Sequence, residues 1–276
     1  LSPDHIGPDE HKDFAEYLAC KSMIFNQSRI GIADCDDEHF AQVTAHAGCP
    51  VYTYGIDHEA DFQAGQIRYV AEDAFVGLEF VSSGRLCLDV RVSIPGRFNI
   101  SNAMAALSVC SFFHLPEEKM SHALEHFRVD GRMELAYASA KCKVIIDYAH
   151  NAVSMESLLT TLRDYHPKRL VVVFGCGGNR SKDRRYAMGE MAGRMADLSI
   201  ITADNSRYEK VEDIIADIKS ALIPTGGYFY EIPDRREAIT YAITHAEEGD
   251  MIAIIGKGHE DYQEVNGVRT HFLDRE

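Results

Sequence analysis

The C-terminal half of the chain alternates two kinds of segment in a regular order. From Lys143 onward, apolar runs rich in β-branched residues alternate with segments whose apolar residues recur at helical spacing. This alternation is typical of βαβ units, which build a mostly parallel sheet through right-handed crossovers. The expected strands are 143–149, 169–175, 197–204, 228–232 and 251–256, and the expected helices are 154–165, 187–195, 211–222 and 234–246.

Polar motifs follow four of these strands, each at the point where the strand ends. They read DYAHN from Asp147, GCGGNRSKDRR from Gly175, DNSR from Asp204 and GKGHED from Gly256. In open α/β sheets, ligands bind at the carboxyl ends of the strands. A buried strand that leads into a glycine turn and a helix start also presents backbone N–H groups to an anion. The sequence therefore predicts one binding site where the four motifs converge.

The spacing within these motifs excludes several familiar sites. No G-x-x-x-x-G-K-[ST] segment occurs, and GCGGNR does not fit the G-x-G-x-x-G dinucleotide pattern. Arg207 could bind a carboxylate through two parallel hydrogen bonds while Asp204 takes an ammonium, which is the pattern of an amino-acid receptor. The alternatives are that DNSR is a turn capping the next helix and that GKGHED is a tight turn with an exposed acidic pair.

The N-terminal half reads as a mixed α/β region. Expected helices are 12–26, 38–47, 99–113 and 116–127, and expected strands are 29–33, 50–54, 67–71, 77–81 and 87–94. We expect Asn99 or Ser101 to cap the third helix. Residues 129–135 are predicted to form a turn, and we place the domain boundary between residues 133 and 134.

Composition limits the class of protein further. A net charge of −15 argues against a general nucleic-acid binder, and no apolar run approaches the length of roughly 18–20 residues that spans a membrane. Seven scattered cysteines without a C-x-x-C pair predict reduced thiols and a cytoplasmic location. We favour a monomer. Because the chain begins with Leu1 and shows no signal segment, we expect a piece of a longer protein or a processed one.

Taken together, six motifs resemble those of the Mur ligase family. SPDHI and YLACK precede DYAHN, FGCGGNR, DNSR and GKGHEDYQ in the same order over essentially the whole chain. The resemblance is greatest to the branch that adds the third residue of the peptidoglycan stem peptide. It implies that residues 1–133 are the C-terminal part of a central ATP-binding α/β domain and that residues 134–276 are a Rossmann-like domain. The UDP-binding domain and the P-loop would be absent, so the fragment alone is expected to be inactive.

The family chemistry implied by this resemblance is ATP-dependent amide formation through an acyl phosphate, with ATP and Mg²⁺ as cofactors. The substrates would be UDP-N-acetylmuramoyl-L-alanyl-D-glutamate (the UDP-muramoyl dipeptide) and an amino acid. His5 resembles a Mg²⁺ ligand, and Lys21 resembles a lysine that the family carbamylates near the metal. The residues that resemble nucleotide contacts are Asn99, Asn102, Arg132, Asp147 and the neighbouring His150. The residues that resemble the amino-acid pocket are Arg180, Asp204, Asn205, Arg207, Gly256 and Glu260.

The DNSR motif indicates which amino acid is used. Family members that select meso-diaminopimelate usually read D-N-P-R, and here Ser206 replaces the proline while Arg207 is kept. An arginine suits the distal carboxylate, which lysine lacks, so we favour meso-diaminopimelate. The loss of proline leaves the loop less rigid. The alternatives are an L-lysine-adding ligase, an oxidoreductase with an unusual glycine turn, and a non-catalytic module of the same fold.

Overall fold

The computed structural model describes residues 10–72 and 74–276, which form two compact units. The first unit takes in the chain up to Arg68 and the segment Leu78–Phe127. The second consists of Arg128–Glu276 together with Tyr69–Gly77. The predicted domain boundary between residues 133 and 134 stays a prediction. Each unit is an α/β structure, and the predicted fold class is confirmed.

The first unit is built on a five-stranded sheet in the order β1-β2-β3-β4-β5. Strands β1 to β3 pair in parallel, whereas β4 and β5 are antiparallel. Its strands are β1 (Gly31–Asp34), β2 (Val51–Gly55), β3 (Phe62–Glu72), β4 (Phe75–Gly84) and β5 (Leu88–Val92). Its helices are α1 (Phe14–Ser22), α2 (Ile24–Gln27), α3 (Phe40–Thr44), α4 (Phe98–Phe112) and α5 (Glu117–His126). The expected strands are therefore all present, and β3 and β4 are longer than predicted.

Two predictions for helices of the first unit are wrong. The helix expected over 12–26 begins after the Asp13 cap and breaks at Met23 into α1 and α2. Helix α4 is capped by neither Asn99 nor Ser101, because both lie inside it, its N-cap is Arg97 and no side chain caps it. Asn99 lies inside the first turn, where its amide donates to the Pro95 carbonyl at 2.7 Å.

The second unit is built on a six-stranded sheet in the order β10-β9-β8-β11-β7-β6. All its pairings are parallel except that of the edge strand β6 with β7. Its strands are β6 (Glu134–Ala138), β7 (Cys142–Asp147), β8 (Arg169–Phe174), β9 (Leu198–Ile201), β10 (Phe229–Glu231) and β11 (Asp250–Ile255). Its helices are α6 (Ala152–Arg163), α7 (Lys182–Met195), α8 (Val211–Leu222) and α9 (Arg235–Thr244). The hairpin β12 (Tyr262–Val265) and β13 (Val268–His271) follows β11.

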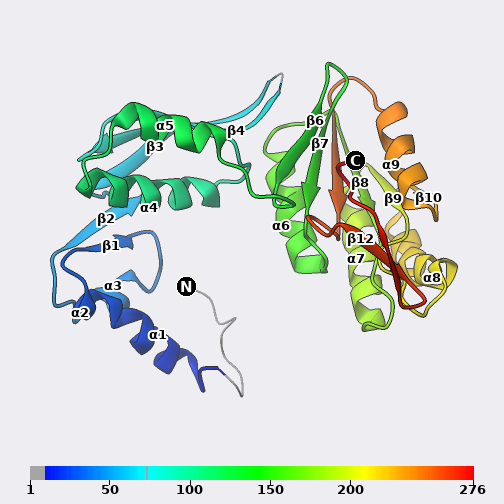
Figure 1. The fold of residues 1–276 in the computed structure, drawn as a ribbon, viewed down its shortest axis with the longest axis horizontal. Helices are drawn as coiled ribbons and strands as arrows, with labels where there is room; N and C mark the ends of the chain where they lie inside the picture. Colours follow the sequence, from blue (N-terminus) through cyan, green and yellow to red (C-terminus); the bar gives the residue numbers. More distant parts are fainter. Residues whose placement is uncertain (1–9, 73) are drawn as a thin grey trace. The chain divides into compact units, whose positions relative to one another are not determined.

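Helices cover both faces of this sheet (Figure 1), because its strands are apolar on both sides. On one face, Val144, Val171 and Ile252 pack against Ala238 and Ala242 of α9. Helices α6, α7 and α8 contact one another in series, and each also packs on a strand. A parallel sheet buried on both faces is expected to read as near-continuous hydrophobic runs, which is what the sequence shows.

The structure corrects two predictions for the second unit and adds one element. Helix α7 begins at Lys182 after the Ser181 cap, not near Ala187, so Lys182, Arg184 and Arg185 lie within its first turn and Arg180 lies just before it. The turn expected over 129–135 ends early, because β6 begins at Glu134. The hairpin β12–β13 was not predicted, although Asn266 and Gly267 have φ values of 50° and 73°, as an Asn-Gly hairpin turn requires.

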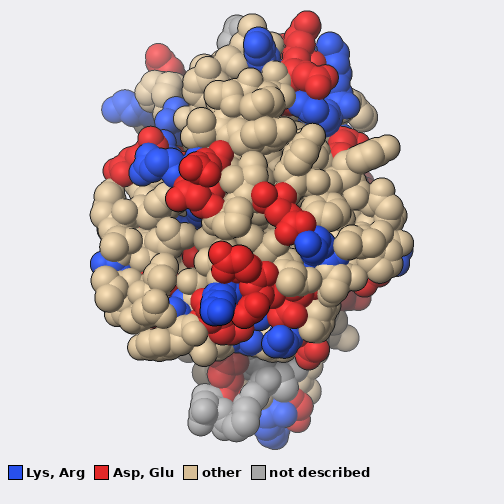
Figure 2. Space-filling view, turned by 90° about the vertical axis from the view of Figure 1, so that its right-hand side faces the viewer, with Lys and Arg blue, Asp and Glu red and all other residues tan. Residues whose placement is uncertain are grey.

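The surface carries both signs of charge. Figure 2 shows acidic and basic side chains intermingled on one face. No helix in the described parts of the chain is long and apolar enough to cross a membrane. All seven cysteines are free, as predicted for reduced thiols.

A buried ion pair joins the C-terminal segment to α9. Arg235 donates to both carboxylate oxygens of Asp274 at 2.7 Å, and both side chains are fully buried. The same guanidinium donates to the carbonyls of Ala203 and Ile255, at the ends of β9 and β11. Burial opposes the charge, but Asp274 more than compensates and raises the pKa of Arg235. This pair therefore fixes two strand ends at the edge where the motifs lie.

We expect Asp274→Asn to lower the free energy of unfolding by about 3 kcal/mol, because it leaves a buried guanidinium without its counter-charge. Urea denaturation of this chain measures the change. The control is Glu276→Gln, which removes an exposed pair with His271 and should cost less than about 0.5 kcal/mol. Equal effects of the two substitutions would contradict the structural role of the buried pair.

Candidate functional site

A cavity of about 460 Å³ lies at the carboxyl edge of the second unit's sheet. Its walls come from the segments after β7, β8, β9 and β11 and from the hairpin. The lining residues are Tyr148, His150, Gly175, Cys176, Gly177, Arg180, Arg184, Asp204, Asn205, Arg207, Gly256, Glu260, Tyr262 and Arg269. The four polar motifs are thus brought together in one place, as the order of strands and motifs predicts.

The glycine turn after β8 packs directly against the turn after β9. A Cβ on Gly175 would stand 2.2 Å from the Thr202 carbonyl oxygen, and one on Gly178 would stand 1.9 Å from that of Ser206. The Gly178 N–H donates to the Asn205 carbonyl at 2.8 Å. Only glycine permits this approach, so the GCGG sequence is a packing requirement between two turns as well as a possible anion cradle.

Arg207 is held in the cavity wall by its backbone and its side chain. Its N–H donates to the Glu264 carbonyl at 3.0 Å, and its φ is 52°, in the left-handed region. Its Nη1 donates to the Gly178 carbonyl at 2.7 Å. A guanidinium has five N–H donors, so one bond to Gly178 leaves donors for a carboxylate in the cavity.

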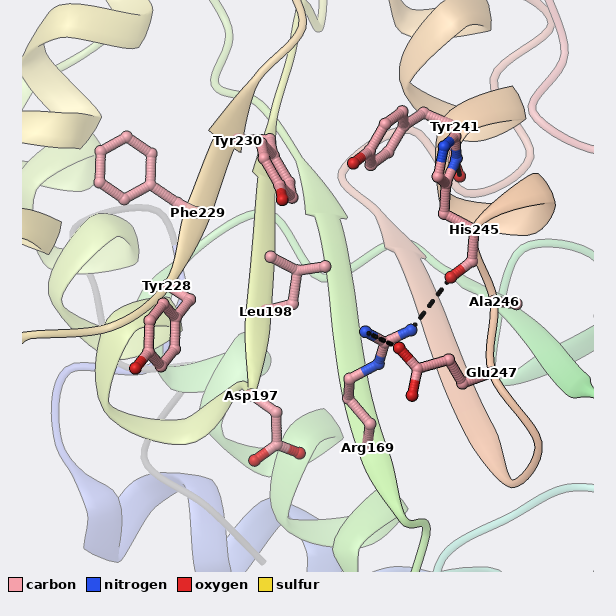
Figure 3. Close-up of a pocket in the computed structure, with 10 residues that line it drawn as sticks. All are labelled: Arg169, Asp197, Leu198, Tyr228, Phe229, Tyr230, Tyr241, His245, Ala246 and Glu247. Atoms are coloured by element: carbon pink, nitrogen blue, oxygen red, sulfur yellow. Dashed lines mark hydrogen bonds and ion pairs between the residues drawn. The ribbon is translucent and has the colours of Figure 1, made fainter.

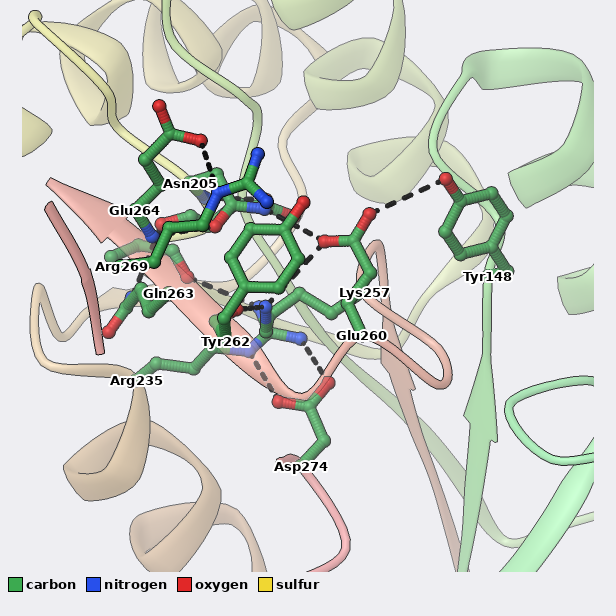
Figure 4. A network of polar contacts seen from close by, with 12 residues as sticks. Tyr148, Asn205, Arg235, Lys257, Glu260, Tyr262, Gln263, Glu264, Arg269 and Asp274 are labelled. Carbon is green, nitrogen blue, oxygen red and sulfur yellow. Dashed lines mark hydrogen bonds and ion pairs between the residues drawn. The ribbon is translucent and has the colours of Figure 1, made fainter. Parts of the chain in front are cut away.

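Glu260 is the centre of a polar network in the cavity wall (Figure 4). Its Oε2 accepts a hydrogen bond from the Asn205 amide at 2.8 Å, and its Oε1 lies 3.5 Å from the Tyr148 hydroxyl. The Asn205 Oδ1 in turn accepts from the Glu264 N–H at 2.8 Å. Asn205 therefore ties the turn after β9 to both the GKGHED turn and the hairpin.

Two further predicted residues, Arg132 and Asp147, lie beside Tyr148. The Arg132 guanidinium is 5.2 Å from the centre of the Tyr148 ring. The Asp147 carboxylate accepts from the N–H groups of Met133 and Ala149, both at 2.8 Å. Burial raises the pKa of Asp147, although these two hydrogen bonds and Arg132 oppose the shift. Each carboxylate oxygen retains acceptor capacity for a hydroxyl group.

The basic cluster after the glycine turn divides into two pairs. Arg180 and Arg184 line the cavity. Lys182 pairs with Asp217 at 3.0 Å, and the buried Arg185 pairs with Glu209 at 2.7 Å and with Asp217 at 2.9 Å. Lys182 and Arg185 therefore fasten α7 to α8 and to Glu209 in the segment before α8. Of the four residues, only Arg180 and Arg184 line the cavity.

Several lining residues were missed by sequence reasoning. Tyr262 and Arg269 come from the hairpin, and the Arg269 guanidinium lies 4.3 Å from the Tyr262 ring centre. The Asn-Gly turn between two alternating segments was the signal that could have found them. Arg184 could not be distinguished by sequence from the neighbouring basic residues of RSKDRR. Cys176 is a wall residue and not a nucleophile, because burial raises the pKa of its thiol to about 12.

The remaining predicted residues lie outside this cavity. His5 falls outside the described residues. Asn99 and Asn102 lie on α4 in the first unit, hydrogen-bonded to each other at 3.0 Å. Lys21 on α1 lines a smaller cavity of about 370 Å³ with Asp34 and Tyr54. Burial raises the pKa of Asp34, and it raises that of Tyr54 to about 12.

A larger cavity, of about 720 Å³, lies at the opposite edge of the second unit's sheet. Figure 3 shows its aromatic wall, in which the rings of Tyr241 and His245 stack at 3.9 Å. Its cation, Arg169, is already bound to Asp250 at 2.6 Å and to the His245 carbonyl at 3.1 Å. The motifs and the uncommitted arginines lie at the carboxyl edge, so we place the candidate site there and not in the larger cavity.

Fold and site together define an α/β protein that presents arginines and carboxylates at the carboxyl edge of a parallel sheet. Sequence comparison then identifies the family. Residues 1–110 match the Mur ligase middle domain, and residues 131–258 match the family described as Mur ligase, glutamate ligase domain. The chain belongs to the Mur ligase family, as the motifs indicated.

The similar proteins agree with this assignment. A UDP-N-acetylmuramoyl-L-alanyl-D-glutamate--2,6-diaminopimelate ligase of Caldanaerobacter subterraneus is 36% identical over 278 residues, which is all of this chain and 56% of the relative. The ligase of the same name from Thermosynechococcus vestitus is 37% identical, with the same coverage. A solved structure with that name matches with a TM-score of 0.77 and 31% identity, over 99% of this chain and 57% of the other. The chain thus spans just over half the length of these relatives.

We expect Gly178→Ala to destabilise the second unit by more than about 3 kcal/mol, because its methyl group would collide with a backbone carbonyl that cannot move aside. Gly226→Ala is the control in the same unit. Nothing lies within 4 Å of a Cβ there, so the control bears only the strain of a φ of 76°, about 1 kcal/mol. Chemical denaturation compares the two. Equal losses would show that the two turns do not need their close contact.

Proposed function

We propose that the chain is part of an ATP-dependent ligase that joins meso-diaminopimelate to UDP-N-acetylmuramoyl-L-alanyl-D-glutamate. The observation that carries this proposal is the cavity at the carboxyl edge, where Arg180 and Arg207 share the walls with Asp204 and Glu260. Both signs of charge in one cavity suit a zwitterionic amino acid. The relatives over the whole chain are ligases that use this amino acid by name.

In this proposal the arginines bind the carboxylates of the amino acid, and the acids bind ammonium groups. Arg207 is placed for the distal carboxylate by its bond to Gly178. Asp204 and Glu260 take an ammonium, and Asn205 holds Glu260 at 2.8 Å. Gly256 allows the backbone after β11 to lie close to the Asp204 carboxylate. Its φ is 110°, and a Cβ there would lie 2.6 Å from that carboxylate.

The proposed nucleotide residues of the second unit are Asp147, Arg132 and His150, and the proposed adenine contacts of the first unit are Asn99 and Asn102. Asp147 suits ribose hydroxyls because its oxygens retain acceptor capacity. ATP supplies activation of the substrate carboxylate as an acyl phosphate, and Mg²⁺ offsets the charge of the transferred phosphoryl group. His5 and Lys21, as a carbamate, are the proposed metal residues. Within residues 10–72 and 74–276, no cluster of three or more His, Cys, Asp or Glu side chains could hold a metal, so we derive no step through the ion.

The experiment is phosphate release by the full-length gene product that contains this chain. It receives ATP, Mg²⁺ and the UDP-muramoyl dipeptide, with either meso-diaminopimelate or L-lysine. We expect release with diaminopimelate alone. Release with lysine alone would keep the reaction but overturn the amino-acid assignment, and release with neither would favour a non-catalytic module.

We expect Arg207→Met to raise the KM for diaminopimelate by about 100-fold, because it removes a charge-assisted pair with a carboxylate. The KM for ATP should change by less than about threefold, since Arg207 is not among the proposed nucleotide residues. Steady-state kinetics of the same gene product measure both constants. Lys182→Met, which removes a surface pair with Asp217, is the control and should leave both unchanged. An unaltered diaminopimelate KM would refute the role of Arg207.

A further inference from the structure

Lys257 is a fully buried lysine within the GKGHED motif, with an exposure of 0%. Lysine is almost never fully buried unless it is paired. Its Nζ donates to the Tyr262 carbonyl and lies 3.7 Å from the Glu260 carboxylate (Figure 4). Burial lowers the pKa of Lys257, against the attraction of Asp204 and Glu260. The chain thus keeps a costly buried cation directly behind the candidate site.

Lys257 does not line the cavity, whereas its neighbours Gly256, Glu260 and Tyr262 do. Any effect of Lys257 on a ligand must therefore pass through one of these neighbours. Its ammonium contacts the Glu260 carboxylate and the Tyr262 carbonyl, so it fixes one carboxylate of the site and the first residue of the hairpin.

The charged groups around Lys257 differ in their partners. Arg235 and Asp274 neutralise each other through two hydrogen bonds of 2.7 Å. Lys257 is attracted by two carboxylates of the cavity wall, Asp204 and Glu260. Of the two, Glu260 forms an ion pair with Lys257, at 3.7 Å.

We propose that Lys257 is a positioning residue of the amino-acid site. Its ammonium holds the Glu260 carboxylate in place, so that Glu260 meets the ammonium group of the incoming amino acid. This inference rests on the proposed function and adds to it a residue that does not touch the substrate.

The pH dependence of amino-acid use separates this role from a purely structural one. Other titratable or charged groups face Lys257 and Glu260 from the surrounding elements, namely Tyr148, Asp204, Arg235, His259, Tyr262 and Asp274. The substitution Lys257→Met removes the Lys257 ammonium and leaves all of these groups in place. A carboxylate that loses a neighbouring cation is protonated at higher pH. Loss of the bond to Tyr262 alone would not move the acid limb of a pH profile.

The experiment measures kcat/KM for diaminopimelate between pH 5.5 and 9 in the full-length gene product. For Lys257→Met we expect the KM for diaminopimelate to rise about 30-fold with the KM for ATP nearly unchanged. We expect the acid limb of the kcat/KM profile to move to higher pH. Lys182→Met is the matched control and should shift neither. An unmoved acid limb, or equal changes in both KM values, would overturn the proposal.

A double-mutant cycle covers the case in which Lys257→Met alone does not fold. Replacing both partners of a buried pair is tolerated better than removing one. If Lys257 acts through Glu260, the double variant Lys257→Met with Glu260→Gln should match Glu260→Gln alone within about twofold. Independent, additive losses would overturn the proposal. Wild-type turnover with diaminopimelate is measured first, because its absence refutes the proposed function and not the role of Lys257.

Discussion

The close approach of two turns is the constraint on which the candidate site depends. The turn after β8 and the turn after β9 meet backbone to backbone, with the Gly178 N–H on the Asn205 carbonyl and no room for a Cβ on Gly178. This contact sets the position of Asn205 and of Arg207, whose guanidinium returns to Gly178. A larger residue would separate the turns, and the cavity walls would separate with them.

The rest of the site is attached to this contact by polar groups from distant parts of the chain. Asn205 bonds to Glu260 and to the backbone of β12, so three segments share one amide side chain. Behind them, the Arg235–Asp274 pair holds the ends of β9 and β11. Buried networks of this kind hold one geometry only when every partner is satisfied. The cavity is therefore fixed in shape by groups that do not all face it.

Local patterns in the sequence were sufficient for the parallel strands of the second unit and for the convergence of the motifs. The apolar runs that give β7, β8, β9 and β11 are continuous, as expected for strands buried on both faces. Because parallel strands present their carboxyl ends at one edge, DYAHN, GCGGNR, DNSR and GKGHED had to meet. The start of α7 was misplaced, because a run of charged residues conceals the helical period, although Ser181 is of a type that caps helices well.

The sequence by itself determined the order of elements, the parallel sheet and the set of motifs, because hydrophobic period and turn chemistry are local properties. Tertiary structure decided which members of those motifs face the cavity. It assigned Arg180 and Arg184 to the cavity but Arg185 to a buried pair with Asp217, and it placed Lys257 behind Glu260. These outcomes depend on which distant groups pack together. Like-charged neighbours in sequence carry no information about their partners in space.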